Sequence, residues 1–305
     1  MRASLRTSSL ALAPWLLLVA CDPASDDAGG DTTDGAVIKT YPATVGGKRA
    51  ADVIRPADFV EGEVLPAVVL LHGYSSWGED TDIIFHLAER VDTDRFLLVM
   101  PDGKEDLTGN QFWNATDDCC NWFGAKVDDV AYLSGLVADL RDGYDLTEVA
   151  VVGHSNGAYM AYRLACDAPE AVDRLVTVAG AVPLQAPSCV GGKDIPLLHL
   201  HGTYDEVIGY DPYDGSFGGV ATVGAAETVR RYAERAGCDA TTHDVGTADL
   251  ASTIRGDESS GAAYDGCPAP VALWSVEGGY HLFTDATEAL RDGVAAFALG
   301  GDPTF

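Results

Sequence analysis

The stretch "VAVVGHSNGAYMAYRLAC", residues 149–166, joins a run of strand-forming residues to an alanine-rich helical pattern through the pentapeptide GHSNG. This pentapeptide matches the pattern G-x-S-x-G at a junction of strand, turn and helix. The turn is so tight that its flanking positions accept little beyond hydrogen, and the serine is held out above the sheet. The motif therefore predicts a nucleophilic serine at Ser155.

Apolar runs elsewhere in the chain predict the sheet around this motif, because runs without polar alternation are typical of strands covered on both faces. We expect such strands at residues 66–73, 95–103, 148–153, 173–180, 195–202 and 270–279. Helical spacing separates them, at residues 82–91, 127–144, 155–166, 223–237 and 285–299. This alternation predicts an α/β fold with a mainly parallel, doubly wound sheet and helices on both faces.

A serine hydroxyl needs a base oriented by an acid, and around this motif the chain order is Ser, then Asp or Glu, then His. His281 follows the last expected strand in "EGGYHLF", where two glycines free the backbone, and it is our candidate base. His199 and His201 lie in or at the end of an expected buried strand, so core or loop-shaping roles suit them better. His243 falls in a weakly patterned region.

The acid should follow the strand before His281. The segment "HLHGTYDEV", residues 199–207, offers Asp205 and Glu206, and Asp211 and Asp214 come further along. Asp205 comes first after the strand and is preferred. It would hold the tautomer of the base and stabilise the imidazolium without taking the proton itself.

An oxyanion hole in this architecture combines two backbone N–H groups. One should belong to Asn156, the residue after the nucleophile. The other should come from the loop after an early strand, and His72-Gly73 before Tyr74 makes the main-chain amide of Tyr74 our second candidate donor.

Two long connections, residues 103–126 and 204–219, leave the carboxyl ends of expected strands, where open α/β sheets bind ligands. The first carries aromatic side chains that would either pack on themselves or form a substrate wall. Our candidate substrate-binding residues are Trp113, Trp122, Phe123 and His154.

These motifs together resemble the α/β-hydrolases, and among them the exported esterases grouped with polyhydroxybutyrate depolymerases and feruloyl esterases. The resemblance covers about residues 50–299 and is most specific in "CCNWFGAKVDDVAYL" and "GHSNGAYMAYRLAC". It implies the α/β-hydrolase fold. The sequence has "GGYH" where "GGGH" is common, and a histidine before the serine where several members have another residue; both departures bear on substrate range.

Six cysteines follow Cys21, and an even number in an exported chain favours disulfides over metal, since no Cys-x-x-Cys or His-x-x-x-His spacing is present. Six cysteines allow about 15 disulfide connectivities, and the sequence by itself does not determine which one forms. The resemblance implies the pairs Cys166–Cys189, Cys238–Cys267 and Cys119–Cys120.

The N-terminal segment is typical of an export signal. Positive charge precedes the short apolar run "LALAPWLLLVA", and the segment ending at Cys21 resembles a bacterial lipobox. We expect a lipoprotein signal peptide at residues 1–20, lipidation of Cys21, and an acidic flexible tether at residues 21–35. A single catalytic domain should occupy residues 36–305, in the bacterial cell envelope on the periplasmic or cell-surface side, or released.

The chain has 47 acidic residues against 19 basic ones, a net charge of −28. Such a surface repels nucleic acid and anionic membranes, so we expect a neutral ester substrate, which could be polymeric, and membrane contact only through the lipid anchor. We expect a monomer that uses neither a metal nor an organic cofactor.

The residues favour an exported serine esterase acting through Ser155, His281 and Asp205 on polyester, feruloyl or acetyl esters. Three alternatives stay open. They are a serine peptidase, a binding protein on an inactive hydrolase scaffold, and a carbohydrate-surface protein that uses the aromatic loop.

Overall fold

The computed structural model describes residues 39–185, 194–216 and 219–305. The predicted signal peptide, Cys21, the predicted tether and Cys189 lie outside the described residues. Residues 39–305 form one compact unit. Within the described ranges, no helix has both the length and the apolar character needed to cross a membrane.

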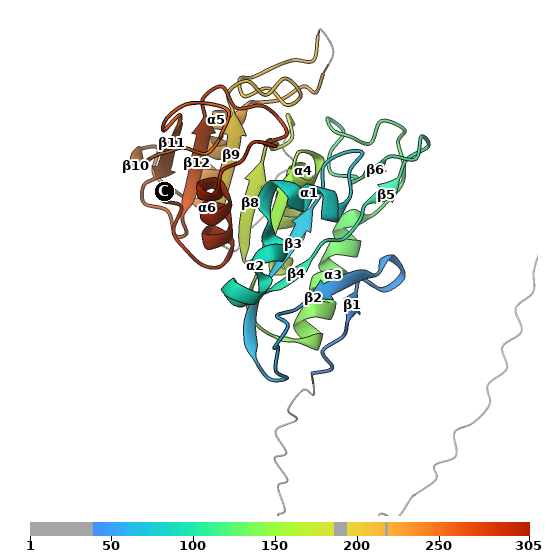
Figure 1. Ribbon diagram of the computed structural model, residues 1–305. Helices are drawn as coiled ribbons and strands as arrows, with labels where there is room; N and C mark the ends of the chain where they lie inside the picture. Colours follow the sequence, from blue (N-terminus) through green and yellow to red (C-terminus); the bar gives the residue numbers. More distant parts are fainter. Residues whose placement is uncertain (1–38, 186–193, 217–218) are drawn as a thin grey trace, which may run out of the picture. The chain divides into compact units, whose positions relative to one another are not determined.

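A ten-stranded sheet runs through this unit in the order β1-β2-β4-β3-β7-β8-β9-β12-β11-β10. Figure 1 shows β10 and β11 at one end of the sheet and β1 and β2 at the other. The strands are β1 Thr44–Val45, β2 Ala51–Ile54, β3 Val64–Leu71, β4 Leu97–Val99, β7 Asp145–His154, β8 Arg174–Val178, β9 Leu197–Gly202, β10 Thr242–Ala248, β11 Ser259–Tyr264 and β12 Val271–Val276.

The six central strands, from β4 to β12, are parallel to one another and correspond to the six expected apolar runs. Their side chains are buried because helices cover both faces, which is why these runs lack polar alternation. The predicted fold class, a mainly parallel doubly wound sheet, is confirmed. Parallel registers bring the carboxyl ends of these strands to one edge.

Both ends of the sheet are antiparallel, and the sequence did not indicate these strands. At one end β1 pairs with β2 and β2 with β4, and at the other β10 pairs with β11 and β11 with β12. A separate two-stranded sheet, β5 Lys104–Glu105 and β6 Gln111–Phe112, lies within the long connection after β4.

Two apolar clusters lie on opposite faces of the sheet. One buries side chains of α3, α4 and α5, and the other buries side chains of α1, α2 and α6. The helices are α1 Gly78–Phe85, α2 Leu87–Arg90, α3 Asp129–Gly143, α4 Asn156–Asp167, α5 Ala225–Ala236 and α6 Glu288–Ala298, with 3-10 turns at Gly47–Arg49 and Pro169–Ala171 and a π-helical turn at Val91–Arg95.

The single helix expected at residues 82–91 is instead two helices. His86 adopts a left-handed conformation between α1 and α2. The Asp82 carboxylate accepts hydrogen bonds from the amides of Leu87, at 2.7 Å, and Ala88, at 2.9 Å. A side chain of the first helix thus caps the second, a contact that apolar spacing does not reveal.

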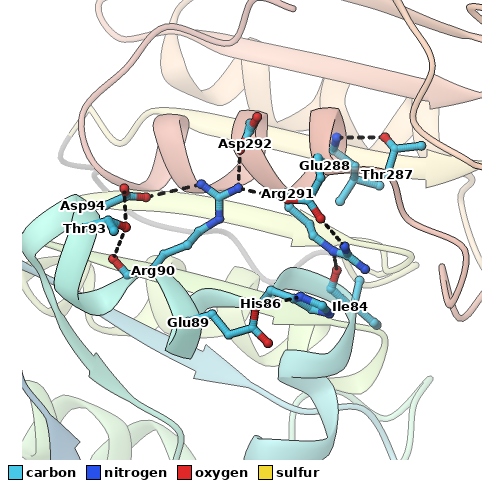
Figure 2. A network of polar contacts seen from close by, with 11 residues as sticks. Ile84, His86, Glu89, Arg90, Thr93, Asp94, Thr287, Glu288, Arg291 and Asp292 are labelled. Atoms are coloured by element: carbon cyan, nitrogen blue, oxygen red, sulfur yellow. Dashed lines mark hydrogen bonds and ion pairs between the residues drawn. The ribbon is translucent and has the colours of Figure 1, made fainter.

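An ion-pair network joins α6 to the α1–α2 segment (Figure 2). The Arg90 guanidinium bonds to Asp94 and Asp292, and the Arg291 side chain donates to the Ile84 carbonyl, at 3.3 Å. Each exposed pair contributes on the order of 0.2–1 kcal/mol. The network nevertheless connects α6, which follows the His281 loop, to a helix that borders the site described next.

Candidate active site

The turn at Ser155 is a sharp connection between β7 and α4. Ser155 has a φ of 54°, in the left-handed region that non-glycine residues rarely adopt. Its amide donates to the Val178 carbonyl, at 2.9 Å. A Cβ atom at Gly153 would lie against the Gly157 carbonyl, and one at Gly157 would lie against the Leu71 carbonyl. The two glycines are therefore required because three backbone segments approach closely here.

Ser155, His281 and Asp205 meet above the carboxyl ends of β7, β12 and β9. The Nε2 atom of His281 lies 3.0 Å from the Ser155 Oγ atom, and its Nδ1 atom lies 2.8 Å from Oδ2 of Asp205. All three residues are buried. Since a carboxylate only accepts, Nδ1 of His281 carries the proton and Nε2 is free to accept the serine proton. This arrangement can activate the hydroxyl as a nucleophile.

Four nitrogen atoms surround the Asp205 carboxylate. Oδ1 accepts the amides of Val207, at 2.9 Å, and Ile208, at 2.8 Å, while Oδ2 faces His281 and, at 3.2 Å, Nε2 of His201. Burial by itself would raise the pKa of Asp205, but the hydrogen bonds from the two histidines outweigh it and the pKa lies below its usual range. The carboxylate therefore stays ionised.

The loops that carry Asp205 and His281 are tied together. The Tyr204 amide donates to the Gly279 carbonyl, at 2.9 Å, and the Gly278 amide donates to Thr203 Oγ1, at 2.8 Å. A Cβ at Gly202 would meet the Gly279 backbone. The glycines before His281 thus let its loop lie directly on the loop of the acid.

His154 is buried beside the candidate base. Its Nε2 donates to the His281 carbonyl, at 2.9 Å, and the two rings lie 5.1 Å apart between centroids. Burial, followed by the proximity of His281, lowers the pKa of His154 to about 4. His154 is therefore neutral near pH 7 and acts as a fixed hydrogen-bond donor to the His281 loop.

The two candidate oxyanion donors belong to loops that Trp113 holds together. The Asn156 side chain accepts the Trp113 amide, at 2.7 Å, and donates to the Trp113 carbonyl, at 3.0 Å. The indole N–H donates to the His72 carbonyl, at 3.0 Å. His72 in turn accepts the Gly103 amide on Nε2, at 2.8 Å. Positions that must donate to a developing charge are thereby kept rigid.

The Tyr74 side chain is also fixed. Its hydroxyl donates to Oδ2 of Asp106, at 2.6 Å, and accepts from Nδ2 of Asn110, at 3.1 Å. Its ring makes an edge contact with Trp122, at 6.4 Å between centroids. The backbone of the candidate donor is thus anchored by its own side chain.

A cavity of about 360 Å³ opens at Ser155 and His281. Of the candidate substrate-binding residues, His154 and the half-exposed Trp122 border the cavity, and Phe123 lies outside it. Trp113 does not border the cavity either, because its side chain is fully buried beneath the His72 loop. Substrate binding by these residues stays a prediction. The apolar side chains that border the cavity are Tyr74, Ile83, Ile84, Trp122, Val207, Ile208, Val220 and Leu282.

Two of the implied disulfides are present. Cys238 bonds to Cys267, and Cys119 bonds to its neighbour Cys120 in the wall of the cavity. The pairing of Cys166 with Cys189 stays a prediction, since Cys189 lies outside the described residues.

The contact between His201 and Asp205 was not predicted from the sequence, where His201 was expected to have a core or loop-shaping role. The segment "HGTYD" contains a signal for it, because a histidine stands four residues before the acid at the end of a strand.

Comparisons with known proteins agree with the fold. A family model described as alpha/beta hydrolase fold matches residues 66–194. A bifunctional acetylxylan esterase/xylanase of Neocallimastix patriciarum is 24% identical over 259 residues, which are 79% of this chain and 36% of that protein. The chain thus spans little more than a third of that relative's length.

Among solved structures, an acetyl xylan esterase from Aspergillus awamori matches with a TM-score of 0.55 and 14% identity. The match covers 80% of this chain and 92% of that one. At this level of identity, the likeness shows a shared fold.

Proposed function

Because a family model described as alpha/beta hydrolase fold matches residues 66–194, we propose that the chain is a serine esterase with Ser155 as nucleophile, His281 as general base and acid, and Asp205 as orienting acid. The observation that carries this proposal is the hydrogen-bond chain from Ser155 Oγ, 3.0 Å from His281, through His281 to Asp205, 2.8 Å away. It opens onto an apolar cavity where an ester could lie.

In the proposed cycle Ser155 Oγ attacks the ester carbonyl while His281 Nε2 takes the hydroxyl proton. The amides of Asn156 and Tyr74 would stabilise the oxyanion, each contributing about 3 kcal/mol in the transition state. His281 then gives its proton to the leaving alcohol, and water hydrolyses the acyl-enzyme by the same route in reverse.

The substrate that we propose is a neutral carboxylic ester. The apolar side chains around the cavity favour an uncharged group, and the net charge of −28 disfavours an anionic one. Among neutral esters we propose acetyl esters of carbohydrates first, supported by the names of the two relatives. Feruloyl esters and polyesters are the other classes to test.

The test is a substrate panel: p-nitrophenyl acetate, acetylated xylan, methyl ferulate, a polyester film and casein as an amide control. We expect turnover of the acetyl esters by the native enzyme, and a loss of at least about 10⁴-fold for Ser155→Ala. Equal turnover by Ser155→Ala would refute the role of the serine. Faster cleavage of casein than of any ester would favour a peptidase.

We also propose export and lipid anchoring through Cys21, on the basis of the apolar run and lipobox-like segment that precede it. Cells expressing the full chain and fed an alkyne-bearing fatty acid should yield a labelled protein, whereas Cys21→Ala should stay unlabelled. Equal labelling of the two proteins would contradict this anchor.

A further inference from the structure

Behind Asp205 lies a row of buried polar side chains that the proposed cycle does not use. His199 and His201 are two residues apart on β9, so their side chains lie on the same face of the sheet. Nε2 of His199 lies 3.1 Å from Nδ1 of His201, and both side chains are fully buried. Beyond them, Nδ1 of His199 lies 3.0 Å from the Tyr162 hydroxyl and 2.8 Å from that of Thr177.

The neighbours of His201 determine where its proton lies. Nε2 faces two groups that only accept, the Ile208 carbonyl, at 2.8 Å, and Oδ2 of Asp205, at 3.2 Å. Nε2 therefore carries the proton, and Nδ1 of a neutral ring must accept from His199. Burial lowers the pKa of His199 well below its usual value, so the His199 ring is neutral.

The rest of the row fits the same assignment. With its proton on Nε2, His199 must accept on Nδ1, and the Tyr162 hydroxyl can donate there. The Thr177 hydroxyl donates to the Tyr162 oxygen, at 2.9 Å. The row therefore holds His201 in a single tautomer, whose N–H points at the Ile208 carbonyl and at the acid.

We propose that His201 is a positioning residue for Asp205, fixed by His199, and that it sets how strongly Asp205 binds the base. This inference rests on the proposed function of the triad. Oδ2 of Asp205 accepts from His281 and lies 3.2 Å from Nε2 of His201, so both rings act on one centre of negative charge. Without His201 this oxygen is less well oriented and more basic towards His281, which would then hold its proton to a higher pH.

Other titratable groups around His281 do not account for such a change. His154, the last residue of β7, is neutral at pH values well above 4 because its pKa is lowered to about that value. Across the cavity stand Asp80 of α1 and Tyr74 of the loop after β3. None of these groups forms a hydrogen bond to His201 in the described part of the chain, so replacing His201 leaves their own hydrogen bonds in place.

A matched pair of variants tests the proposal. In His201→Gln the side-chain amide nitrogen can occupy the position of Nε2 and donate to Asp205, whereas in His201→Asn the shorter amide falls short. We expect His201→Asn to lower kcat by about 10- to 100-fold, the effect of losing one hydrogen bond to a charged group. KM should change little, because His201 does not border the cavity.

The pH profile separates positioning from a merely structural role. For His201→Asn the acid limb of kcat/KM should move up by about half a unit to one unit, and His201→Gln should restore both the limb and most of kcat. An unchanged kcat in His201→Asn would overturn the proposal. The proposal would also be overturned if His201→Asn lost kcat while the acid limb of kcat/KM stayed at its native pH and His201→Gln recovered neither.

A measurement on the native protein covers the case in which His201→Asn fails to fold. Nuclear magnetic resonance of the ¹⁵N-histidine-labelled protein should show His199 and His201 as neutral Nε2–H tautomers between pH 5 and 8. A protonated ring or an Nδ1–H tautomer at His201 would contradict the assignment. A native protein without ester turnover would instead refute the proposed function, so the two failures are distinguishable.

Discussion

Lowering the pH from 7 to 5 should destabilise this fold through its buried neutral histidines, and His154 allows the effect to be calculated. Its pKa is about 4 in the folded chain. In the unfolded chain a histidine has a pKa of about 6.5, so unfolding takes up a proton between these values and acid favours the unfolded state. Integrated from pH 7 to pH 5, the loss of stability from His154 alone is about 2 kcal/mol.

Urea unfolding followed by tryptophan fluorescence, with disulfides intact, measures this loss in the native protein and in His154→Gln. The glutamine amide can still donate to the His281 carbonyl but does not titrate. The drop in unfolding free energy between pH 7 and pH 5 should be about 2 kcal/mol smaller in His154→Gln than in the native protein. Phe123→Ala, at an exposed side chain that does not titrate, is the control and should leave the drop unchanged. An equal drop in the native protein and in His154→Gln would refute the reasoning.

Two further substitutions test the site. Asp205→Asn should lower kcat by about 10⁴-fold because an amide favours the wrong tautomer of the base, while Glu206→Gln, next to it, should act almost as the native protein does in the p-nitrophenyl acetate assay. Near-native turnover by Asp205→Asn would show that a residue other than Asp205 orients the base. Trp122→Ala should raise KM for esters that reach the cavity wall by about 10-fold, through lost apolar contact, and Phe123→Ala should leave it unchanged. An equal KM for Trp122→Ala and Phe123→Ala would show that Trp122 does not contact the substrate.

The sequence predicted the parts of the fold that depend on local pattern. The apolar runs around Val151 and Leu198 are continuous because both faces of the central strands are covered, and such runs are visible without any long-range information. The pentapeptide at Ser155 and the glycines before His281 mark the positions where the backbone must turn sharply. Together with chain order, they placed the three candidate residues at strand ends.

The edge strands could not be predicted in the same way. The β11 segment "SSGAAY" consists mostly of small residues with little strand preference, and it forms a strand by pairing with the edge of β12. The β10 segment "THDVGTA" lacks a continuous apolar run, and it pairs with β11 in turn.

The position of Trp113 outside the cavity could not be predicted for a related reason. An aromatic residue in a long loop can border a ligand or pack beneath it, and the hydrogen bonds to His72 and Asn156 that bury this indole join segments about 40 residues apart in sequence. The row behind Asp205 is long-range as well, since Tyr162 and Thr177 come from α4 and β8. Single-segment patterns contain no information about such contacts.

Covalent labelling of Ser155 tests the central claim most directly. The native protein, treated with a fluorophosphonate probe, digested and analysed by mass spectrometry, should contain the probe on the peptide that includes Ser155, with a stoichiometry near one, and Ser155→Ala should remain unlabelled. Labelling that persists in Ser155→Ala, or a native protein that stays unmodified, would contradict the assignment of Ser155 as the nucleophile.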